Sequence, residues 1–183
     1  LTTRRVSFLS CTPSLDPKES DKVNGEEAKM IAATVVQAYL MMKNHFDINK
    51  SIGVIVPYRN QISTVRNMID NMSTQHGIDC LHDITIDTVE RYQGSQRDVI
   101  IYSFTIQNFS QLNFLTANTF QEDEYVIDRK LNVAITRARK QLFLTGNPQI
   151  LGANITFYKL MEYIRMNNGY SQTDTDAFCR GDF

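Results

Sequence analysis

One segment places two arginines beside an apolar helical stripe: DRKLNVAITRARKQL, residues 128–142. On a helical wheel, a helix over 128–140 puts Arg137 on one side of the stripe and Arg139 on the other. The stripe consists of Leu131, Ala134, Ile135 and Ala138. A guanidinium keeps its proton and offers forked donors that suit phosphate oxygens. The segment therefore either presents Arg137 to a phosphate or carries solvated basic residues beside a core-facing stripe.

Two further segments contain turn residues next to polar side chains. In ERYQGSQRDV, residues 90–99, Gly94 suits either a plain turn or a close approach of the backbone to a ligand. In VPYRNQ, residues 56–61, Pro57 ends an apolar run, and Tyr58 either stacks on a base or covers the edge of a sheet. Taken alone, neither segment distinguishes these alternatives.

The overall charge argues against a global attraction to polyanions. Nineteen Lys and Arg against 20 Asp and Glu give a net charge of −1, so a polyanion must be met by a local patch. The three cysteines are odd in number and form no C-x-x-C pair, which favours a reducing, cytoplasmic (intracellular) location. No apolar run approaches the roughly 18 residues of a membrane span, so no membrane partner is expected. The chain begins with Leu1 rather than Met, which suggests a fragment of something longer.

Self-contained catalytic and metal sites are not indicated. His76, Cys80 and His82 are close in sequence, but they lack a fourth ligand at metal-site spacing, and we expect no metal there. No Ser-His-Asp order and no pair of carboxylates on one helix face stands out. The sequence therefore does not predict a hydrolase that works alone.

Apolar runs alternate with helical patterns along most of the chain. Strands are predicted around 6–9, 52–56, 84–88, 99–104 and 142–145. Helices are predicted from Gly25 for about five turns, after Pro57, and over 128–140. Asn24, with Glu27 three residues later, reads as a capping box for the first of these helices.

This alternation predicts a three-layer α/β domain with a mostly parallel sheet, occupying residues 1–166. Ligands of such sheets bind at the carboxyl ends of the strands, where we expect the three segments described above. Residues 106–127 are polar and weakly periodic and are predicted to form an irregular excursion. The polar segment 167–183 is predicted to be a flexible tail.

Read together, four segments resemble the end of a superfamily 1 helicase. They are NGEEA, IGVIVPYRNQ, ITIDTVERYQGSQRDVIIYSF and DRKLNVAITRARKQLFLTGNP. The resemblance covers roughly residues 24–150, and it is to the group that contains the nonsense-mediated-decay RNA helicase and the replication helicase-nuclease. It implies the second, C-terminal RecA-like domain, with motifs IV, V and VI.

The resemblance also implies roles for individual residues. Arg137 matches the arginine finger of motif VI, which reaches the γ-phosphate of ATP held by the first RecA-like domain. Gly94 matches the motif V glycine near the nucleotide. Pro57, Tyr58 and Thr88 match positions that face single-stranded DNA or RNA, which such motors hold without reading its sequence.

The chain departs from the family pattern in two ways. Gln96 stands where the family usually has a glutamate near the ribose, so a cofactor-binding contact there would involve an amide. No G-x-x-x-x-G-K-[ST] phosphate loop is found, so the domain lacks its own Walker A motif. ATP and Mg2+ are then expected to be held mainly by the first RecA-like domain of the same polypeptide, and this chain alone is predicted to be inactive.

The sequence thus predicts the C-terminal motor domain of an ATP-dependent helicase, supplying the finger and part of the single-strand track. One alternative is a non-enzymatic, degenerate helicase module that docks nucleic acid or protein. A Walker A lysine upstream in the parent gene would favour the motor. A free-standing nucleotide-binding regulator would need a Gly-rich phosphate loop, which is not found.

Overall fold

The computed structural model describes residues 4–11, 22–92, 95–116, 119–122, 125–172 and 174–180. The strands are β1 (Val6–Ser10), β2 (Ile52–Val56), β3 (Thr85–Thr88), β4 (Arg97–Ser103), β5 (Thr119–Glu122), β6 (Tyr125–Asp128), β7 (Ala138–Gly146) and β8 (Tyr170–Ser171). The α-helices are α1 (Gly25–Met42), α2 (Arg59–His76), α3 (Phe109–Thr116), α4 (Arg129–Arg137), α5 (Pro148–Leu151), α6 (Ile155–Met166) and α7 (Thr175–Arg180). Two short 3-10 helices are η1 (Lys43–His45) and η2 (Asp79–Leu81).

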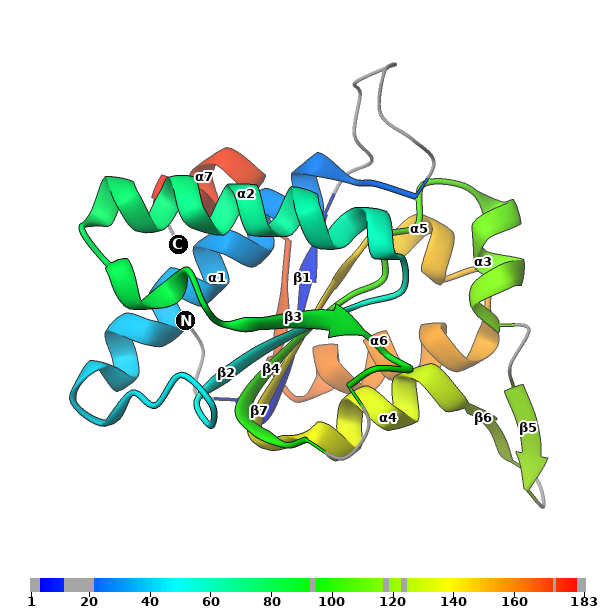
Figure 1. Ribbon diagram of the computed structural model, residues 1–183. Coiled ribbons are helices and arrows are strands. Elements are labelled where there is room, and N and C mark those ends of the chain that lie inside the picture. Colours follow the sequence, from blue (N-terminus) through cyan, green and yellow to red (C-terminus); the bar gives the residue numbers. More distant parts are fainter. Residues whose placement is uncertain are drawn as a thin grey trace.

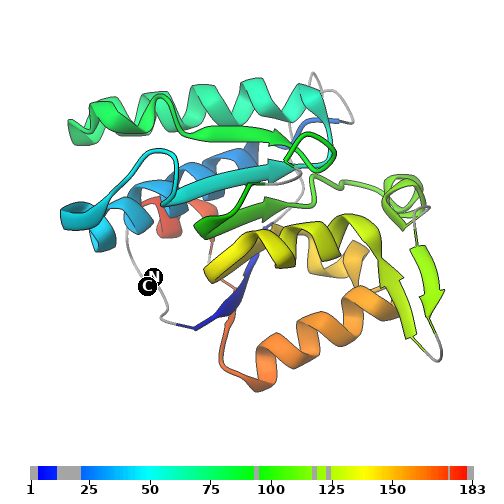
Figure 2. The same ribbon diagram turned by 60° about the horizontal axis from the view of Figure 1, so that its bottom comes forward.

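Six parallel strands form the main sheet, in the order β3-β2-β4-β7-β1-β8. Helices α1, α2 and α7 cover one face, and α4, α5 and α6 lie on the other (Figures 1 and 2). This is the predicted three-layer α/β arrangement with a parallel sheet. A separate antiparallel hairpin, β5–β6, projects away from these layers between α3 and α4 (Figure 2).

The central strands are buried because helices cover both faces of the sheet. Their apolar side chains point alternately into the two hydrophobic cores, one on each face. In β4, Val99 and Ile101 pack toward α1 and α2, whereas Ile100 and Tyr102 pack toward α4 and α6. All four side chains are at most 2% exposed. Since both faces of the sheet are covered, a near-continuous apolar run is the expected signature of such a strand.

The first helix begins where the sequence predicts. The Asn24 side chain accepts a hydrogen bond from the backbone N–H of Glu27 at 3.0 Å, and α1 then runs for 18 residues, or five turns. Helix α2 starts at Arg59, directly after the Pro57-Tyr58 turn, as predicted. It ends at Gly77, whose φ of 65° is the left-handed conformation that glycine adopts readily.

The boundary between α4 and β7 differs from the prediction. The helix was expected over 128–140, but it ends at Arg137, and Ala138 already begins β7. Ala138 is the register partner of Arg97 in β4, so strand pairing prevails over the helix propensity of the following residues. Arg139 therefore lies on a strand, and the wheel angle between Arg137 and Arg139 does not apply.

Two segments predicted to lack regular structure contain it. Within 106–127, α3 and the hairpin β5–β6 form, and Ile106 and Leu115 are fully buried. In the predicted tail, β8 pairs with β1 and α7 packs against α1, with Phe178 only 2% exposed. The segment 167–183 was predicted to be flexible because a two-residue strand and a single buried aromatic side chain leave almost no periodic signal in the sequence.

Candidate functional site

Arg137 lies at the amino edge of the sheet, meaning the edge where the parallel strands begin. It is the last residue of α4, whose first turn is capped by the Asp128 carboxylate, which accepts from the backbone N–H of Leu131 at 2.8 Å. Leu131 and Ala134 anchor the helix in the core. The Arg137 side chain is half-buried, and among the described residues its covered Nε has no hydrogen-bond partner. The structure thus fixes the base of this side chain and leaves one buried donor unsatisfied.

Gln96 lies at the same edge and connects α4 to the start of β7. Its Nε2 donates to the carbonyl of Thr136 at 3.3 Å, and its Oε1 accepts from the Nε of Arg139 at 3.4 Å. The carboxamide itself is exposed. Gln96 thus contacts the last turn of α4, which ends at Arg137. That Gln96 and Arg137 belong to one site stays a prediction, and Gly94 lies outside the described residues.

The segment that follows β3 packs into the core that contains α4. Tyr92, in this segment, is 1% exposed and packs so closely on Gly53 that a Cβ there would lie 1.7 Å from the phenol oxygen. Burial raises the pKa of Tyr92 to about 12. The Arg97 guanidinium is 5.8 Å from the Tyr92 ring centroid, and it donates to the Thr85 hydroxyl at 3.1 Å. Gly53 is therefore required for the close approach of this segment.

Pro57, Tyr58 and Thr88 gather at the opposite, carboxyl edge, where the strands end. Thr88 is the register partner of Val56, so the end of β3 lies beside the Pro57-Tyr58 turn. All three predicted residues are buried: Tyr58 is 9% and Thr88 5% exposed. Little of the Tyr58 ring is exposed, which favours covering of the sheet edge, and its role toward nucleic acid stays a prediction.

The sequence reasoning missed the exposed residues of this turn. Arg59 and Asn60, the first two residues of α2, are exposed at the carboxyl edge. Their type was visible in the sequence, but only the structure separates them from the buried Tyr58. A cation and an amide at this place are suitable groups for contacts with a phosphate backbone.

A buried polar network that the sequence reasoning also missed joins three segments of the carboxyl edge. Its central group is the Glu27 carboxylate, which accepts from the Ser103 hydroxyl at 2.5 Å, the Thr105 amide at 3.0 Å and the Asn24 side-chain amide at 3.3 Å. Burial raises the pKa of Glu27 to about 7, although the hydrogen bonds from Ser103 and Thr105 act in the opposite direction. The capping-box spacing was a signal for Asn24 and Glu27, but nothing in the sequence indicated Ser103.

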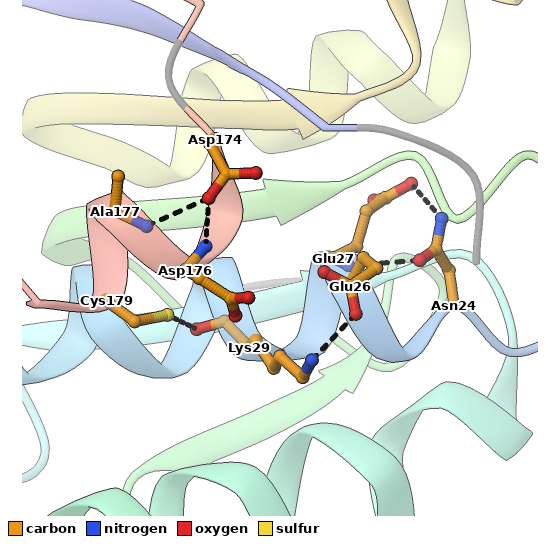
Figure 3. Close-up of polar contacts among 8 residues, drawn as sticks. All are labelled: Asn24, Glu26, Glu27, Lys29, Asp174, Asp176, Ala177 and Cys179. Atoms are coloured by element: carbon orange, nitrogen blue, oxygen red, sulfur yellow. Dashed lines mark hydrogen bonds and ion pairs between the residues drawn. The ribbon is translucent and has the colours of Figure 1, made fainter. Parts of the chain in front are cut away.

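Two carboxylates, Glu26 and Glu27, occupy the first turn of α1 (Figure 3). Glu26 pairs with Lys29 at 2.8 Å, and Glu27 faces the Asn24 side chain. Helix α7 lies across α1, and the Cys179 thiol points to the Lys29 carbonyl at 3.8 Å. The positive end of a helix dipole can bind a phosphate, but at the start of α1 two carboxylates already occupy this position. This terminus is therefore unsuited to holding the phosphates of a nucleotide.

Metal and membrane sites can be assessed for the described part of the chain. There, no three or more His, Cys, Asp and Glu side chains cluster in a way that could hold a metal ion. His82, one of the residues considered, contacts the Asp70 carboxylate at 2.8 Å instead. None of the described helices combines the length and the apolar character that a membrane crossing requires.

The predicted site residues thus fall into two groups rather than one. All three segments were expected at the carboxyl ends of the strands, and this was wrong for Gln96 and Arg137. Gln96 directly precedes β4, and Arg137 directly precedes β7. The next residues, Arg97 and Ala138, are register partners, so Gln96 and Arg137 lie at the same edge of the sheet. The reason is that Arg137 precedes its strand, whereas the Pro57-Tyr58 turn follows its own. One domain therefore presents two separate sets of polar groups.

Residues 2–149 match the family described as AAA domain. The chain belongs to this family and is the C-terminal RecA-like domain of a superfamily 1 helicase, in the group of the nonsense-mediated-decay and replication helicases.

Named relatives are helicases. The chain is 32% identical over 131 residues to the mouse RNA helicase Mov10l1, covering 69% of this chain and 10% of that protein. It is 35% identical over 119 residues to DNA polymerase alpha-associated DNA helicase A of Saccharomyces cerevisiae, covering 64% of this chain and 15% of that protein. The chain therefore spans only a small part of the length of these curated relatives.

A solved structure is also similar to the chain. It is the C-terminal domain of a possible DNA helicase from Lactobacillus plantarum, with a TM-score of 0.45 and 14% identity, and the match covers 85% of this chain and 84% of that one.

Proposed function

We propose that this chain is the second motor domain of an ATP-dependent helicase, with Arg137 as its arginine finger. The observation that carries the proposal is the half-buried guanidinium at the amino edge, whose covered Nε lacks a partner among the described residues. A covered N–H without an acceptor costs free energy, and a turn of the half-buried side chain toward an anionic oxygen from another domain would remove that cost.

The chemistry that Arg137 would perform is stabilisation of charge. During phosphoryl transfer, charge is spread over the oxygens of the γ-phosphate, and a planar, permanently protonated fork suits that distribution. Bound Mg2+ would neutralise charge on the same phosphates. The described residues offer no acidic cluster for this ion, and carboxylates fill the start of α1. In this proposal, ATP and Mg2+ are held mainly by the first RecA-like domain of the same polypeptide.

Gly94 and Gln96 complete the nucleotide side of the proposal. The exposed Gln96 carboxamide lies one hydrogen bond from the Thr136 carbonyl, next to Arg137. An amide can donate to or accept from a ribose hydroxyl without carrying charge. This supports a nucleotide contact by Gln96 in place of the glutamate that the family usually has.

Single-stranded DNA or RNA would cross the carboxyl edge. Pro57, Tyr58 and Thr88 shape this surface, and because their side chains are buried, we expect backbone groups and the exposed Arg59 and Asn60 to make the contacts. Such contacts hold the phosphate backbone without reading bases. The separation of the two edges supports a motor that engages nucleotide and nucleic acid at different places.

ATPase assays on the 183-residue chain and on the full-length protein test this proposal. We expect strand-stimulated turnover from the full-length protein and none above a blank from the chain alone, because the finger then has no phosphates to act on. If the chain alone hydrolysed ATP and Arg137→Ala abolished that activity, the proposal that ATP is held by the first RecA-like domain would be overturned. A full-length protein without strand-stimulated turnover would favour the degenerate docking module.

A further inference from the structure

The buried network at the carboxyl edge joins parts of the chain that are far apart in sequence. Glu27 belongs to α1, whereas Ser103 ends β4 and Thr105 lies in the segment that follows. All three residues are 0% exposed. Thr105 has a φ of 49°, which is uncommon for a β-branched residue, and its N–H is held by the Glu27 carboxylate at 3.0 Å. The carboxylate thus fixes the backbone immediately after β4.

The network continues to the Pro57-Tyr58 turn. The Asn24 backbone N–H donates to the Gln61 side-chain oxygen at 2.9 Å, and the Gln61 amide donates back to the Asn24 carbonyl at 2.9 Å. The Gln61 backbone N–H in turn donates to the Tyr58 carbonyl at 3.1 Å. Since the Asn24 side chain also donates to Glu27, one continuous path runs from the segment after β4 to the turn after β2.

We propose that Glu27 is the positioning residue that fixes these two segments relative to each other and thereby shapes the surface that holds single-stranded nucleic acid. The proposal rests on the proposed function of the carboxyl edge. Glu27 itself is fully buried, so it would not touch the nucleic acid directly. It would act through the Thr105 amide on one side and through Asn24 and Gln61 on the other.

The donors and acceptors explain why a carboxylate is needed. One oxygen of Glu27 accepts from Ser103 and Thr105, and the other accepts from the Asn24 side-chain amide. In Glu27→Gln, the new NH2 group would face the Asn24 NH2 group, and two donors would meet in a buried site. Asn24 cannot simply turn over, because its own side-chain oxygen accepts from the Glu27 backbone N–H.

This geometry suggests a test by exchange of the two partners. At pH 9, well above the Glu27 pKa of about 7, Glu27→Gln alone leaves two facing donors, and Asn24→Asp alone leaves two facing carboxylate oxygens. In the double variant, the amide introduced at position 27 can donate to the carboxylate introduced at position 24, while the amide oxygen still accepts from Ser103 and Thr105. We expect each single variant of the full-length protein to bind a single-stranded oligonucleotide about tenfold more weakly, and the double variant to recover within about threefold.

Glu26→Gln is the matched control, because Glu26 lies in the same turn and pairs only with the partly exposed Lys29 in the described structure. It should leave oligonucleotide affinity unchanged. The Michaelis constant for ATP should stay within about twofold in all variants, since the network does not reach the amino edge. Unfolding curves ensure that each variant is compared where it is fully folded.

Hydrogen exchange separates failure of this inference from failure of the proposed function. In Glu27→Gln, exchange at the Thr105 and Gln61 amides should accelerate together, and a response at only one of them would overturn the coupling. Faster exchange at both with unchanged oligonucleotide affinity would show a purely structural role and overturn the positioning role. A wild-type protein that binds no single strand would overturn the proposed function, while joint exchange changes would still support the coupling of the two segments.

Discussion

The two edges of the sheet are built in opposite ways. At the carboxyl edge, Glu27, Gln61 and Ser103 are fully buried, and most hydrogen bonds among the network residues are 2.5–3.0 Å long. At the amino edge, Gln96 is exposed and its contacts are 3.3 and 3.4 Å long, while the Nε of Arg137 has no partner in the described structure. The Glu27 network at the carboxyl edge is satisfied within the chain, whereas the Arg137 Nε at the amino edge has no acceptor in the described structure.

This difference indicates what each edge requires to function. A fully satisfied network holds a surface in one shape before any ligand arrives, which lowers the entropic cost of binding. An edge with an unsatisfied cation gains its missing acceptor only in a larger assembly. The comparison therefore predicts that changes at the amino edge affect chemistry, while changes at the carboxyl edge affect stability and nucleic-acid binding.

The largest expected effect is at Arg137. In the full-length protein, Arg137→Ala should lower ATP turnover by on the order of 10³-fold, because in the proposed role the group would stabilise charge that develops only in the transition state. Arg137→Lys should fail as well, since an ammonium does not reproduce the planar fork. Arg139→Ala is the control: its side chain contacts Gln96 from a strand and should matter much less. Matched ATPase assays, with circular dichroism to check folding, decide this, and a stronger loss at Arg139 would reassign the finger.

The next effect concerns the pH dependence of stability at the carboxyl edge. The pKa of Glu27 is raised from 4.5 to about 7 in the folded protein, so between these pH values the folded state retains a proton that the unfolded chain releases. Raising the pH through this window should therefore lower the free energy of unfolding by on the order of 3 kcal/mol. Urea unfolding at several pH values across this window measures the slope, which Glu27→Gln should reduce. If wild type and Glu27→Gln showed the same dependence of the unfolding free energy on pH, Glu27 would not be its source.

A smaller effect is expected in the segment that follows β3. Gly53→Ala places a Cβ 1.7 Å from the Tyr92 phenol oxygen, and it should destabilise the fold by about 1–3 kcal/mol. Tyr92→Phe alone should be nearly neutral, because the phenol oxygen is buried and lacks a partner among the described residues. When Tyr92→Phe is combined with Gly53→Ala, it should restore part of the lost stability. The recovery should be incomplete because a carbon of the ring remains 2.8 Å from the new Cβ. Thermal unfolding of the three variants tests this, and additive losses would exclude the close contact as the cause.

The smallest effect is expected at Gln96. A glutamate could still accept from Arg139, but it could not donate to the Thr136 carbonyl at the end of α4. Gln96→Glu should therefore change the Michaelis constant for ATP by about threefold to tenfold and leave oligonucleotide affinity nearly constant. Steady-state kinetics and fluorescence anisotropy provide the two values. The reverse pattern would move Gln96 from the nucleotide side to the nucleic-acid side.

The fold was largely predictable because most of its strands are apolar and its first helix carries a clear cap. Apolar runs such as Ile52–Val56 appear in the sequence because both faces of the sheet are covered. The end of α4 was not predictable, since Ala138 continues the apolar stripe and only its pairing with Arg97 makes it a strand residue. Local pattern thus defines the elements, and long-range pairing defines some of their ends.

The site was predictable in its residue types but not in its arrangement. Arg137 and the Pro57-Tyr58 turn stand out by sequence, yet nothing local shows that they lie at opposite edges. The Glu27–Ser103 hydrogen bond spans 76 residues, and such a pairing leaves no periodic trace. The burial of Tyr58 likewise depends on neighbours that are distant in the sequence.

The junction between α4 and β7 has a mechanical consequence. No loop separates Arg137 from Ala138, and β7 then runs between β4 and β1 to Gly146 at the far edge. At about 3.3 Å per residue, this strand is roughly 30 Å long. It pairs with β4 from Ala138 onward and with β1 from Leu142 onward. Because no loop lies between Arg137 and β7, we expect a force on this arginine to be transmitted directly into the sheet.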